Sequence, residues 1–222
     1  MIRTFDFILS SLAILVLLPI LLPVMLILAC TGEHHVFYLQ TRIGQGGRPF
    51  SVFKFATMLL NSPNLPGGFI TQAGDPRVLP FGRLLRKTKI NELPQLFNVW
   101  LGQMSVIGPR PVVASHFDLY SPEQQEAIKG MKPGLSGMGS LFFRDEERIL
   151  RHPEHEPKWV HDQVAAPYKG ALELWYARHV SLYLYFKLII LTVLAILNPG
   201  LKPLRWFREL PPPPDLLRHH WE

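Results

Sequence analysis

A short stretch in the middle of the chain combines basic, acidic and apolar side chains in a pattern that suits phosphate chemistry. A basic run, residues 86–89, precedes Asn91 and Glu92, and an apolar helical pattern follows as far as Trp100. Asn91 is of a type that caps helices, so we expect a helix from Asn91 to near Gly102. The Glu92 carboxylate would then lie at the positive end of that helix, where anions and metal-bound phosphates are stabilised. The alternative is a capped core helix with a solvated basic lead-in.

The composition favours one domain with anionic partners. The chain has 222 residues and a net charge of +6, which favours acidic lipid head groups or nucleotides. Nucleic acid is not expected, because the chain has a membrane segment and no recognition motif. Cys30 is the only cysteine, so an internal disulfide is excluded and a reducing compartment is compatible.

The N-terminal part, residues 7–29, is uncharged and almost entirely apolar. As a straight helix it would measure about 35 Å, which is long enough to cross a bilayer. It is too long for a signal peptide, and no small-residue cleavage site follows it. Pro19 and Pro23 are expected to kink the helix. Because positive residues lie on both sides of the segment, the charges permit a span or a hairpin that returns to the same side.

The remaining pattern predicts an α+β fold, mostly helical with short strands. Strands are expected at residues 36–39 and 49–55, joined by a glycine-rich turn, and a surface loop at 61–80. Short or medium helices are expected at residues 81–88, 121–129 and 164–178. Residues 180–197 are apolar but short for a span, and their tyrosines and single lysine suit a helix at the membrane surface. The proline-rich tail, from residue 202, carries aromatic side chains that could touch lipid.

Other polar groups are candidates for ligand binding. Arg110 lies between two prolines that restrict the backbone, and such a preorganised guanidinium suits a phosphate or carboxylate. The alternative is a surface arginine in a turn. Asp145 and Glu146 belong to an acidic run between two arginines, which is either a solvated helix start or a site for a cation or sugar. Three histidines lack metal-site spacing and are expected at the surface: His152, His155 and His161.

The ordered motifs make the chain resemble the bacterial sugar transferase family, the monotopic phosphoglycosyl transferases. The resemblance covers nearly the whole chain and rests on the combination of motifs, since each alone is weak. Besides the proline-broken segment after Asp6, the motifs are Gln40–Gly44, Phe53–Met58, Asp75–Val78, Phe81–Arg86, Glu92–Val99, Met104–Pro111 and Lys132–Gly137.

The resemblance implies transfer of a sugar 1-phosphate from a nucleotide sugar, usually a UDP-sugar, to polyprenyl (undecaprenyl) phosphate, with release of UMP and a requirement for Mg²⁺. This is the initiating step of polysaccharide or glycoconjugate synthesis. It also implies a re-entrant membrane hairpin at residues 1–32, a cytoplasmic catalytic domain at 33–179, and an interfacial helix with a proline-rich tail at 180–222. The protein would be monotopic in the bacterial inner membrane, in contact with membrane lipids, and able to form a homodimer.

Site roles follow from matching the motifs position by position. The family's catalytic pair is Asp-Glu at the position of Asn91 and Glu92, so this chain lacks the usual nucleophile. Ala56 is a second departure, at a position where the family usually has a lysine or arginine. We predict metal binding by Glu92, Asp145 and Glu146. Predicted substrate-binding residues are Lys54, Arg77, Arg86, Arg110, Arg144 and Glu173.

Three accounts of the changed pair remain open at this stage. Glu92 takes over as nucleophile, with Asp145, Glu146 or Glu173 completing a metal site. Alternatively, polyprenyl phosphate attacks directly and Glu92 acts electrostatically. In the third account the protein is a weak or inactive homologue that binds nucleotide sugar as a scaffold in a membrane assembly complex. A generic basic membrane-surface protein ranks last, because it leaves Arg110 and Glu92 unexplained.

Overall fold

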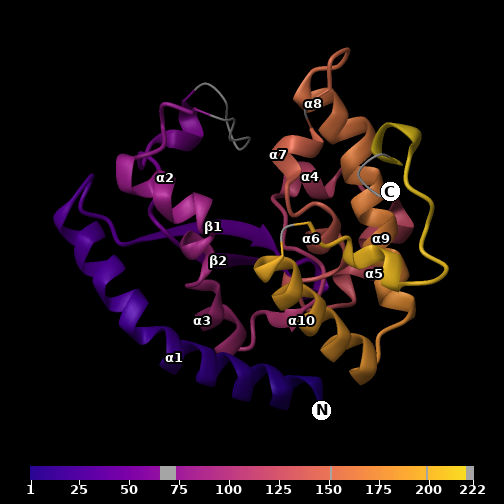
Figure 1. Cartoon of the computed structure of the whole chain (residues 1–222), viewed down its shortest axis with the longest axis horizontal. Helices are drawn as coiled ribbons and strands as arrows, with labels where there is room; N and C mark the ends of the chain where they lie inside the picture. The colour runs from indigo at the N-terminus through magenta and orange to yellow at the C-terminus, as the bar shows by residue number, and fades with distance from the viewer. Residues whose placement is uncertain (66–73, 151, 199, 219–222) are drawn as a thin grey trace. The chain divides into compact units, whose positions relative to one another are not determined.

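The computed structural model describes residues 1–65, 74–150, 152–198 and 200–218, and it confirms the predicted α+β class (Figure 1). The strands are β1 (Phe37–Ile43), β2 (Pro49–Phe55), β3 (Ser105–Ile107) and β4 (Gly134–Ser136). The helices are α1 (Ile2–Cys30), α2 (Pro80–Lys87), α3 (Gln95–Trp100), α4 (Ala114–Phe117), α5 (Pro122–Lys129), α6 (Met138–Phe142), α7 (Glu146–Ile149), α8 (Pro157–Val160), α9 (Ala166–Arg178) and α10 (Leu182–Leu197). The helices expected at residues 81–88, 121–129 and 164–178 are therefore confirmed as α2, α5 and α9.

The chain divides into two compact units, which we describe separately. The first unit consists of Met1, Arg3–Thr41 and Ser51–Gly102. The second consists of Ile2, Arg42–Phe50 and Gln103–Glu222. These units are defined by which residues pack together. The boundaries predicted at residues 32 and 179 were based on membrane association, and they stay a prediction.

The first unit is built on α1, whose 29 residues form one helix with both prolines inside it. Its most apolar stretch of 18 residues has a mean hydropathy of 3.0, and 17% of that stretch is buried. The helix is long and apolar enough to cross a membrane. One side does pack: Leu21, Val24 and Leu28 form a core with Phe55 of β2 and Leu85 of α2. The predicted re-entrant hairpin is not tested by this continuous helix and stays a prediction.

The other end of α1 is attached to α3 in the same unit. The Arg3 guanidinium donates to the carbonyls of Val99 and Trp100, both at 2.6 Å, which are terminal carbonyls of α3. Phe7 stacks on Trp100 with 6.0 Å between ring centroids. Because the helix is about 43 Å long, these contacts and the core at its far end hold α1 to one unit at two widely separated places.

The second unit packs short elements around α9. Strands β3 and β4 pair in parallel, with Ser105 opposite Gly134 and Ile107 opposite Ser136. A Cβ atom at Gly134 would lie 2.1 Å from the backbone nitrogen of Gly108, so glycine is required for this close approach. At the start of α5, Ser121 and Gln124 form a reciprocal capping box.

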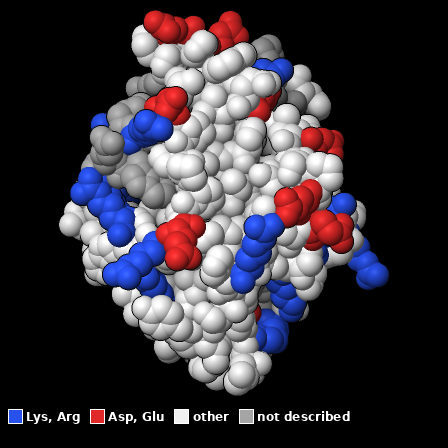
Figure 2. Space-filling model, turned by 90° about the vertical axis from the view of Figure 1, so that its right-hand side faces the viewer, with Lys and Arg blue, Asp and Glu red and all other residues white. Residues whose placement is uncertain are grey.

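Charges are mixed on the face that Figure 2 shows. Lys and Arg side chains lie near Asp and Glu side chains there, with uncharged surface between the groups. The positive net charge therefore does not form one continuous basic field on this face. The Lys and Arg side chains on this face lie in local groups.

Candidate active site

The turn that carries Asn91 and Glu92 differs from the capped helix predicted for it. Lys89 adopts a left-handed conformation, with φ of 59°, and a 3-10 turn follows at Ile90–Glu92 before α3 starts at Gln95. The prediction that Asn91 caps this helix is therefore wrong, since Asn91 lies inside the 3-10 turn and makes no cap hydrogen bond. The left-handed conformation of Lys89 changes the direction in which the chain enters α3. Such backbone strain is often found next to functional groups.

Asn91 is buried, and its side-chain oxygen is unsatisfied. Within the described part of the chain, Oδ1 of Asn91 has no hydrogen-bond partner. A buried acceptor without a donor costs free energy unless a ligand, ion or water satisfies it. The neighbouring Glu92 is half-buried. The turn thus places an unsatisfied amide oxygen beside a carboxyl group.

Asn98 connects this turn to the strand hairpin. Its side chain is fully buried, accepts from the Phe53 amide at 2.9 Å and donates to the Ser51 carbonyl at 2.8 Å. The amide group therefore satisfies two backbone groups of β2 as a neighbouring strand would. Sequence reasoning gave Asn98 no role, although a polar residue within the apolar pattern of this helix was a usable signal.

Lys54 lies on the strand that Asn98 holds. Its ammonium donates to the side-chain oxygen of Gln40 on β1 at 3.2 Å, and the side chain is half-buried. Gln40 belongs to another of the recognised motifs, so the hairpin brings two motif residues together. Ala56, the second departure from the family pattern, is buried next to this strand, where a lysine or arginine would have to find room and a partner.

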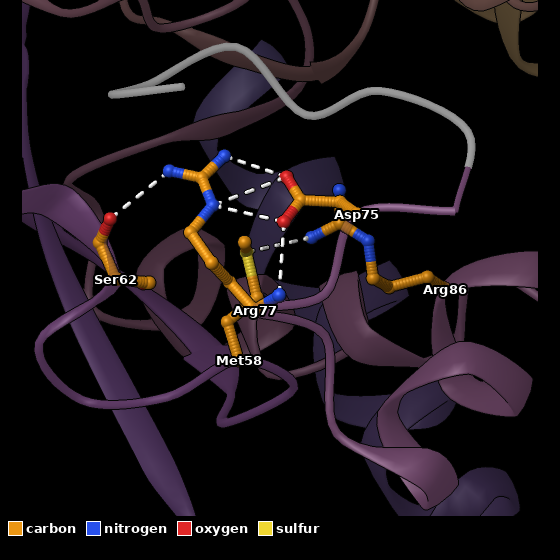
Figure 3. Close-up of polar contacts among 5 residues, drawn as sticks. All are labelled: Met58, Ser62, Asp75, Arg77 and Arg86. Atoms are coloured by element: carbon orange, nitrogen blue, oxygen red, sulfur yellow. Dashed lines mark hydrogen bonds and ion pairs between the residues drawn. The ribbon is translucent and has the colours of Figure 1, made fainter. Parts of the chain in front are cut away.

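Arg77 occupies a structural position within the first unit. Its Nε and Nη2 atoms donate to the Asp75 carboxylate, and its Nη1 donates to the Ser62 carbonyl at 3.0 Å (Figure 3). The side chain is only 4% exposed. Hydrogen bonding with Arg77 lowers the pKa of Asp75 to about 2. All three guanidinium nitrogens are thus committed, and this geometry gives no support to the predicted substrate contact.

Arg86 lies in the last turn of α2, close to the same ion pair. Its Nη1 is 3.6 Å from the sulfur of Met58, and its charge contributes to lowering the pKa of Asp75 (Figure 3). The arginine is half-buried, and the rest of its guanidinium environment includes further interactions. Its predicted role in substrate binding stays a prediction.

In the second unit, Glu173 is a buried carboxyl group that supports the turn containing Arg110. Its Oε1 accepts from the Gly139 amide at 3.1 Å, and its carboxyl group also accepts from the Arg110 amide. Burial raises the pKa of Glu173 to about 8, and these amides and Lys169 only partly oppose that rise. With 3% of its surface exposed, Glu173 is placed to position Arg110, and a direct substrate contact is not evident.

The acidic run before α7 divides into two environments. Asp145 is exposed at the start of the helix, whereas Glu146 forms an ion pair with Lys169 of α9 at 2.5 Å. Burial would raise the pKa of Glu146, but Lys169, His161 and Arg110 outweigh it and the pKa is lowered. Glu146 is therefore held ionised by cations of its own unit.

Arg144, the last of the predicted substrate residues, donates through Nη1 to the Ala195 carbonyl of α10.

Two histidines form a pair that sequence reasoning missed. His161 is buried, which contradicts the surface position expected for it, and its Nδ1 lies 2.7 Å from the Asp162 carboxylate. Its ring is 4.4 Å from that of His116. Burial, His161 and nearby cations lower the pKa of His116 to about 4. His161 also begins a π-helical turn, a feature that often marks functional positions.

Metal binding by the three predicted ligands stays a prediction. In neither unit do three or more His, Cys, Asp or Glu side chains come together among the residues described. Glu92 belongs to the first unit, and Asp145 and Glu146 belong to the second. Magnesium at phosphate-transfer sites commonly uses one or two protein ligands with substrate phosphates, so Asn91 and Glu92 are the pair whose chemistry suits it.

Comparison with known proteins decides the family. Residues 1–199 match the bacterial sugar transferase family. The chain belongs to this family. The predicted resemblance is thereby confirmed, and the inactive-scaffold alternative receives no support from these comparisons.

Several curated relatives of this sugar transferase are about one-third identical to it. It is 34% identical over 200 residues to the UDP-glucose:undecaprenyl-phosphate glucose-1-phosphate transferase of Klebsiella pneumoniae, a match that covers 86% of this chain and 39% of that protein. It is 32% identical over 204 residues to the exopolysaccharide production protein PSS of Rhizobium leguminosarum bv. phaseoli, covering 89% of this chain and 96% of the relative. The chain thus spans about two-fifths of the first relative and nearly all of the second.

Proposed function

We propose that this chain transfers a sugar 1-phosphate from a UDP-sugar to polyprenyl phosphate and releases UMP. The observation that carries the proposal is the turn Ile90–Glu92, where the unsatisfied Asn91 Oδ1 lies beside Glu92 at the position of the family's catalytic pair. The relatives named for undecaprenyl-phosphate glucose-1-phosphate transfer support this reaction. Their printed donor, UDP-glucose, makes it the first sugar donor to test.

The bond changes at phosphorus define what the site has to do. An oxygen nucleophile attacks the phosphorus that bears the sugar, and the bond to the bridging diphosphate oxygen breaks, so that UMP leaves with that oxygen. The charge that develops on phosphate oxygens has to be stabilised by fixed donors and cations. Lys54 on β2 supplies such a cation in the first unit. In the second unit, Glu173 holds the backbone amide of Arg110, and the substrate contact of Arg110 stays a prediction.

Magnesium fits the turn by ligand type. The amide oxygen of Asn91 and the carboxylate of Glu92 are hard oxygen ligands, and the former lacks a protein partner among the described residues. When bound, the ion would offset the negative charge of the diphosphate. Asn91 itself cannot act as the family's nucleophile, since a neutral amide is a poor one. Glu92 is therefore the carboxylate to which we assign the chemistry.

The attachment of α1 supports a monotopic arrangement. Both ends of α1 are held to the same unit, by Arg3 at one end and by the core around Leu28 at the other. A helix that crossed the bilayer would have to carry one of these attachments to the opposite side. We therefore propose that the chain enters and leaves the membrane on the side of its catalytic unit, and that this is the cytoplasmic face of the inner membrane.

The transfer is tested with purified full-length protein, polyprenyl phosphate, Mg²⁺ and a panel of UDP-sugars, by measuring UMP. We expect release with at least one donor and a loss of about a thousand-fold in the Glu92→Gln variant. The Asn91→Asp variant is the matched comparison, because it restores the family's pair. If no donor yields UMP with the native chain while Asn91→Asp is active, the native chain is not a transferase.

The role of Glu92 can be separated from direct displacement. Incubation with a donor labelled in the phosphate next to the sugar, without acceptor, should leave label on the protein if Glu92 is the nucleophile. In direct displacement, the label moves only when polyprenyl phosphate is added. Near-normal turnover by the Glu92→Gln variant would show that Glu92 acts in neither mechanism.

A further inference from the structure

A cavity at the start of α10 has no part in the sugar transfer proposed above. It has a volume of about 360 Å³ and is lined entirely by residues of the second unit. The lining residues that matter here are Trp175, His179, Lys187, Trp206, Phe207 and Arg208. Cations and aromatic rings predominate among them, and acidic side chains are absent from the described lining. The cavity is thus suited to an anionic ligand that also has apolar parts.

The ammonium group of Lys187 is held in place at this cavity. It donates to the Trp206 carbonyl at 2.8 Å and lies 4.3 Å from the centroid of the Phe207 ring and 5.8 Å from that of Tyr183. The carbonyl takes one of its three N–H donors. Arg208 lies on the same lining, so the cavity has two cationic residues for one anion.

Trp175 forms part of the cavity wall. The indole N–H of Trp175 is buried and has no hydrogen-bond partner in the described residues. Its ring stacks on His179 at 4.4 Å and meets Phe207 edge-on at 5.9 Å, so the ring is firmly held.

The helix that starts at this cavity has an exposed apolar stripe. Leu184, Leu188 and Leu191 pack inward, while Ile190 is 56% and Leu197 is 76% exposed. The full stripe comprises Phe186, Ile190, Val193, Leu194 and Leu197. It extends over about 17 Å, roughly the depth of one leaflet of the bilayer. The stripe begins one residue from Lys187. The apolar chains of a ligand whose head group binds in the cavity would therefore lie along the stripe.

The residues around the cavity are of the types found at the level of lipid head groups. Tyr183 and Trp206 are exposed, 75% and 54% respectively, and amphipathic aromatic residues concentrate at membrane–water boundaries. The segment after α10 carries Lys202, Arg205 and Arg208, and such basic groupings next to an apolar helix attract anionic lipids. These features favour a lipid over a second copy of the chain.

We propose that this cavity binds the phosphate of an anionic phospholipid, with the lipid's acyl chains along the exposed stripe of α10. Lys187 and Arg208 bind the phosphate, and the rings of Trp206 and Phe207 contact the glycerol region. Phosphate is the shared chemistry of a lipid head group and of free phosphate, and the size and apolar continuation of the site select the lipid. The site is independent of the transfer reaction.

The test is native mass spectrometry of the full chain in detergent, titrated with phosphatidylglycerol, phosphatidylcholine or inorganic phosphate. We expect phosphatidylglycerol adducts that the Lys187→Gln/Arg208→Gln variant binds roughly 20- to 30-fold more weakly, from the loss of two cations. The Arg148→Gln/Lys158→Gln variant removes two exposed cations elsewhere in the unit and should bind as the native chain does. Lys187→Arg, which keeps the charge, should retain most of the affinity.

Several results would overturn the proposal. Equal binding of phosphatidylcholine, or undiminished binding by the double variant, would show that the two cations do not select an anionic head group. Phosphate that competes for the site at the same concentration as lipid would make it a soluble-anion site. A dimer that resists lipid and dissociates in the Ile190→Gln variant would assign the stripe to a second copy. Circular dichroism of each variant identifies any that fail to fold.

Discussion

Glu173 accepts a hydrogen bond from the backbone amide of Gly139, 3.1 Å away, from a position where only 3% of the glutamate is exposed. The same carboxyl group holds the Arg110 amide, so one buried side chain on α9 fixes both α6 and the turn of the motif that contains Arg110. Its second oxygen has no partner among the described residues. Burial raises its pKa to about 8, so Glu173 is largely protonated at neutral pH.

This raised pKa predicts a pH-dependent effect of Glu173→Gln. Between pH 4.5 and about 8 the unfolded chain loses this proton and the folded chain keeps it, so stability falls as pH rises. Gln cannot ionise and should raise the melting temperature at pH 8.5 relative to the native chain, with little difference near pH 5. Differential scanning fluorimetry in detergent measures it, with the exposed Glu126→Gln as control. A difference that is constant across this range would contradict the assigned cause.

Asn98→Ala should destabilise the first unit. It removes the hydrogen-bond partners of the Phe53 amide and the Ser51 carbonyl and leaves a void at a fully buried position, which we expect to cost about 2–4 kcal/mol, or roughly 5–10 °C in melting temperature. Transfer activity should fall as well, because Lys54 loses the support of its strand. Asn64→Ala, which removes an exposed side-chain contact, is the control. If both variants melt alike, Asn98 does not hold β2.

Arg77→Gln should destabilise the chain more than it affects turnover by the molecules that remain folded. Removing one partner of this ion pair leaves the Asp75 carboxylate shielded and unpaired, which costs about 3 kcal/mol. The exposed Arg83→Gln is the matched control. Because the pKa of Asp75 is lowered from 3.8 to about 2, the stabilisation is present above pH 3.8 and lost as pH falls through 2. A normal melting temperature with lost activity would instead restore Arg77 to the substrate site.

The attachment of both ends of α1 predicts the sidedness of thiol labelling. Cys30 is the only native cysteine and is exposed, so it reports one end of the helix. In a Cys30→Ser background, Thr4→Cys reports the other end, and Arg83→Cys marks the catalytic side. An impermeant maleimide should label all three in inverted membrane vesicles and none in intact spheroplasts. Labelling of Thr4→Cys from the outside only would show that α1 spans the membrane.

The family, the α+β class and most of the helices could be predicted from the sequence alone. These follow from local features: the apolar period of α9 and α10, and the motifs along residues 40–137. The amphipathic pattern of α2 likewise needed no tertiary information, because a helix with one apolar side forms wherever that side can be covered.

The supporting roles of several polar residues became evident only from the tertiary structure. From their residue types alone, Arg77, Glu173 and Asn98 are all compatible with a substrate site. In the structure, Glu173 and Asn98 are buried against backbone groups of distant segments, and Arg77 is buried against Asp75, two residues away, and the Ser62 carbonyl. The turn at Asn91 also escaped local reasoning, since the left-handed Lys89 changes how the chain enters α3. Burial and hydrogen-bond partners depend on contacts across the fold, and the spacing of residues along the chain does not contain them.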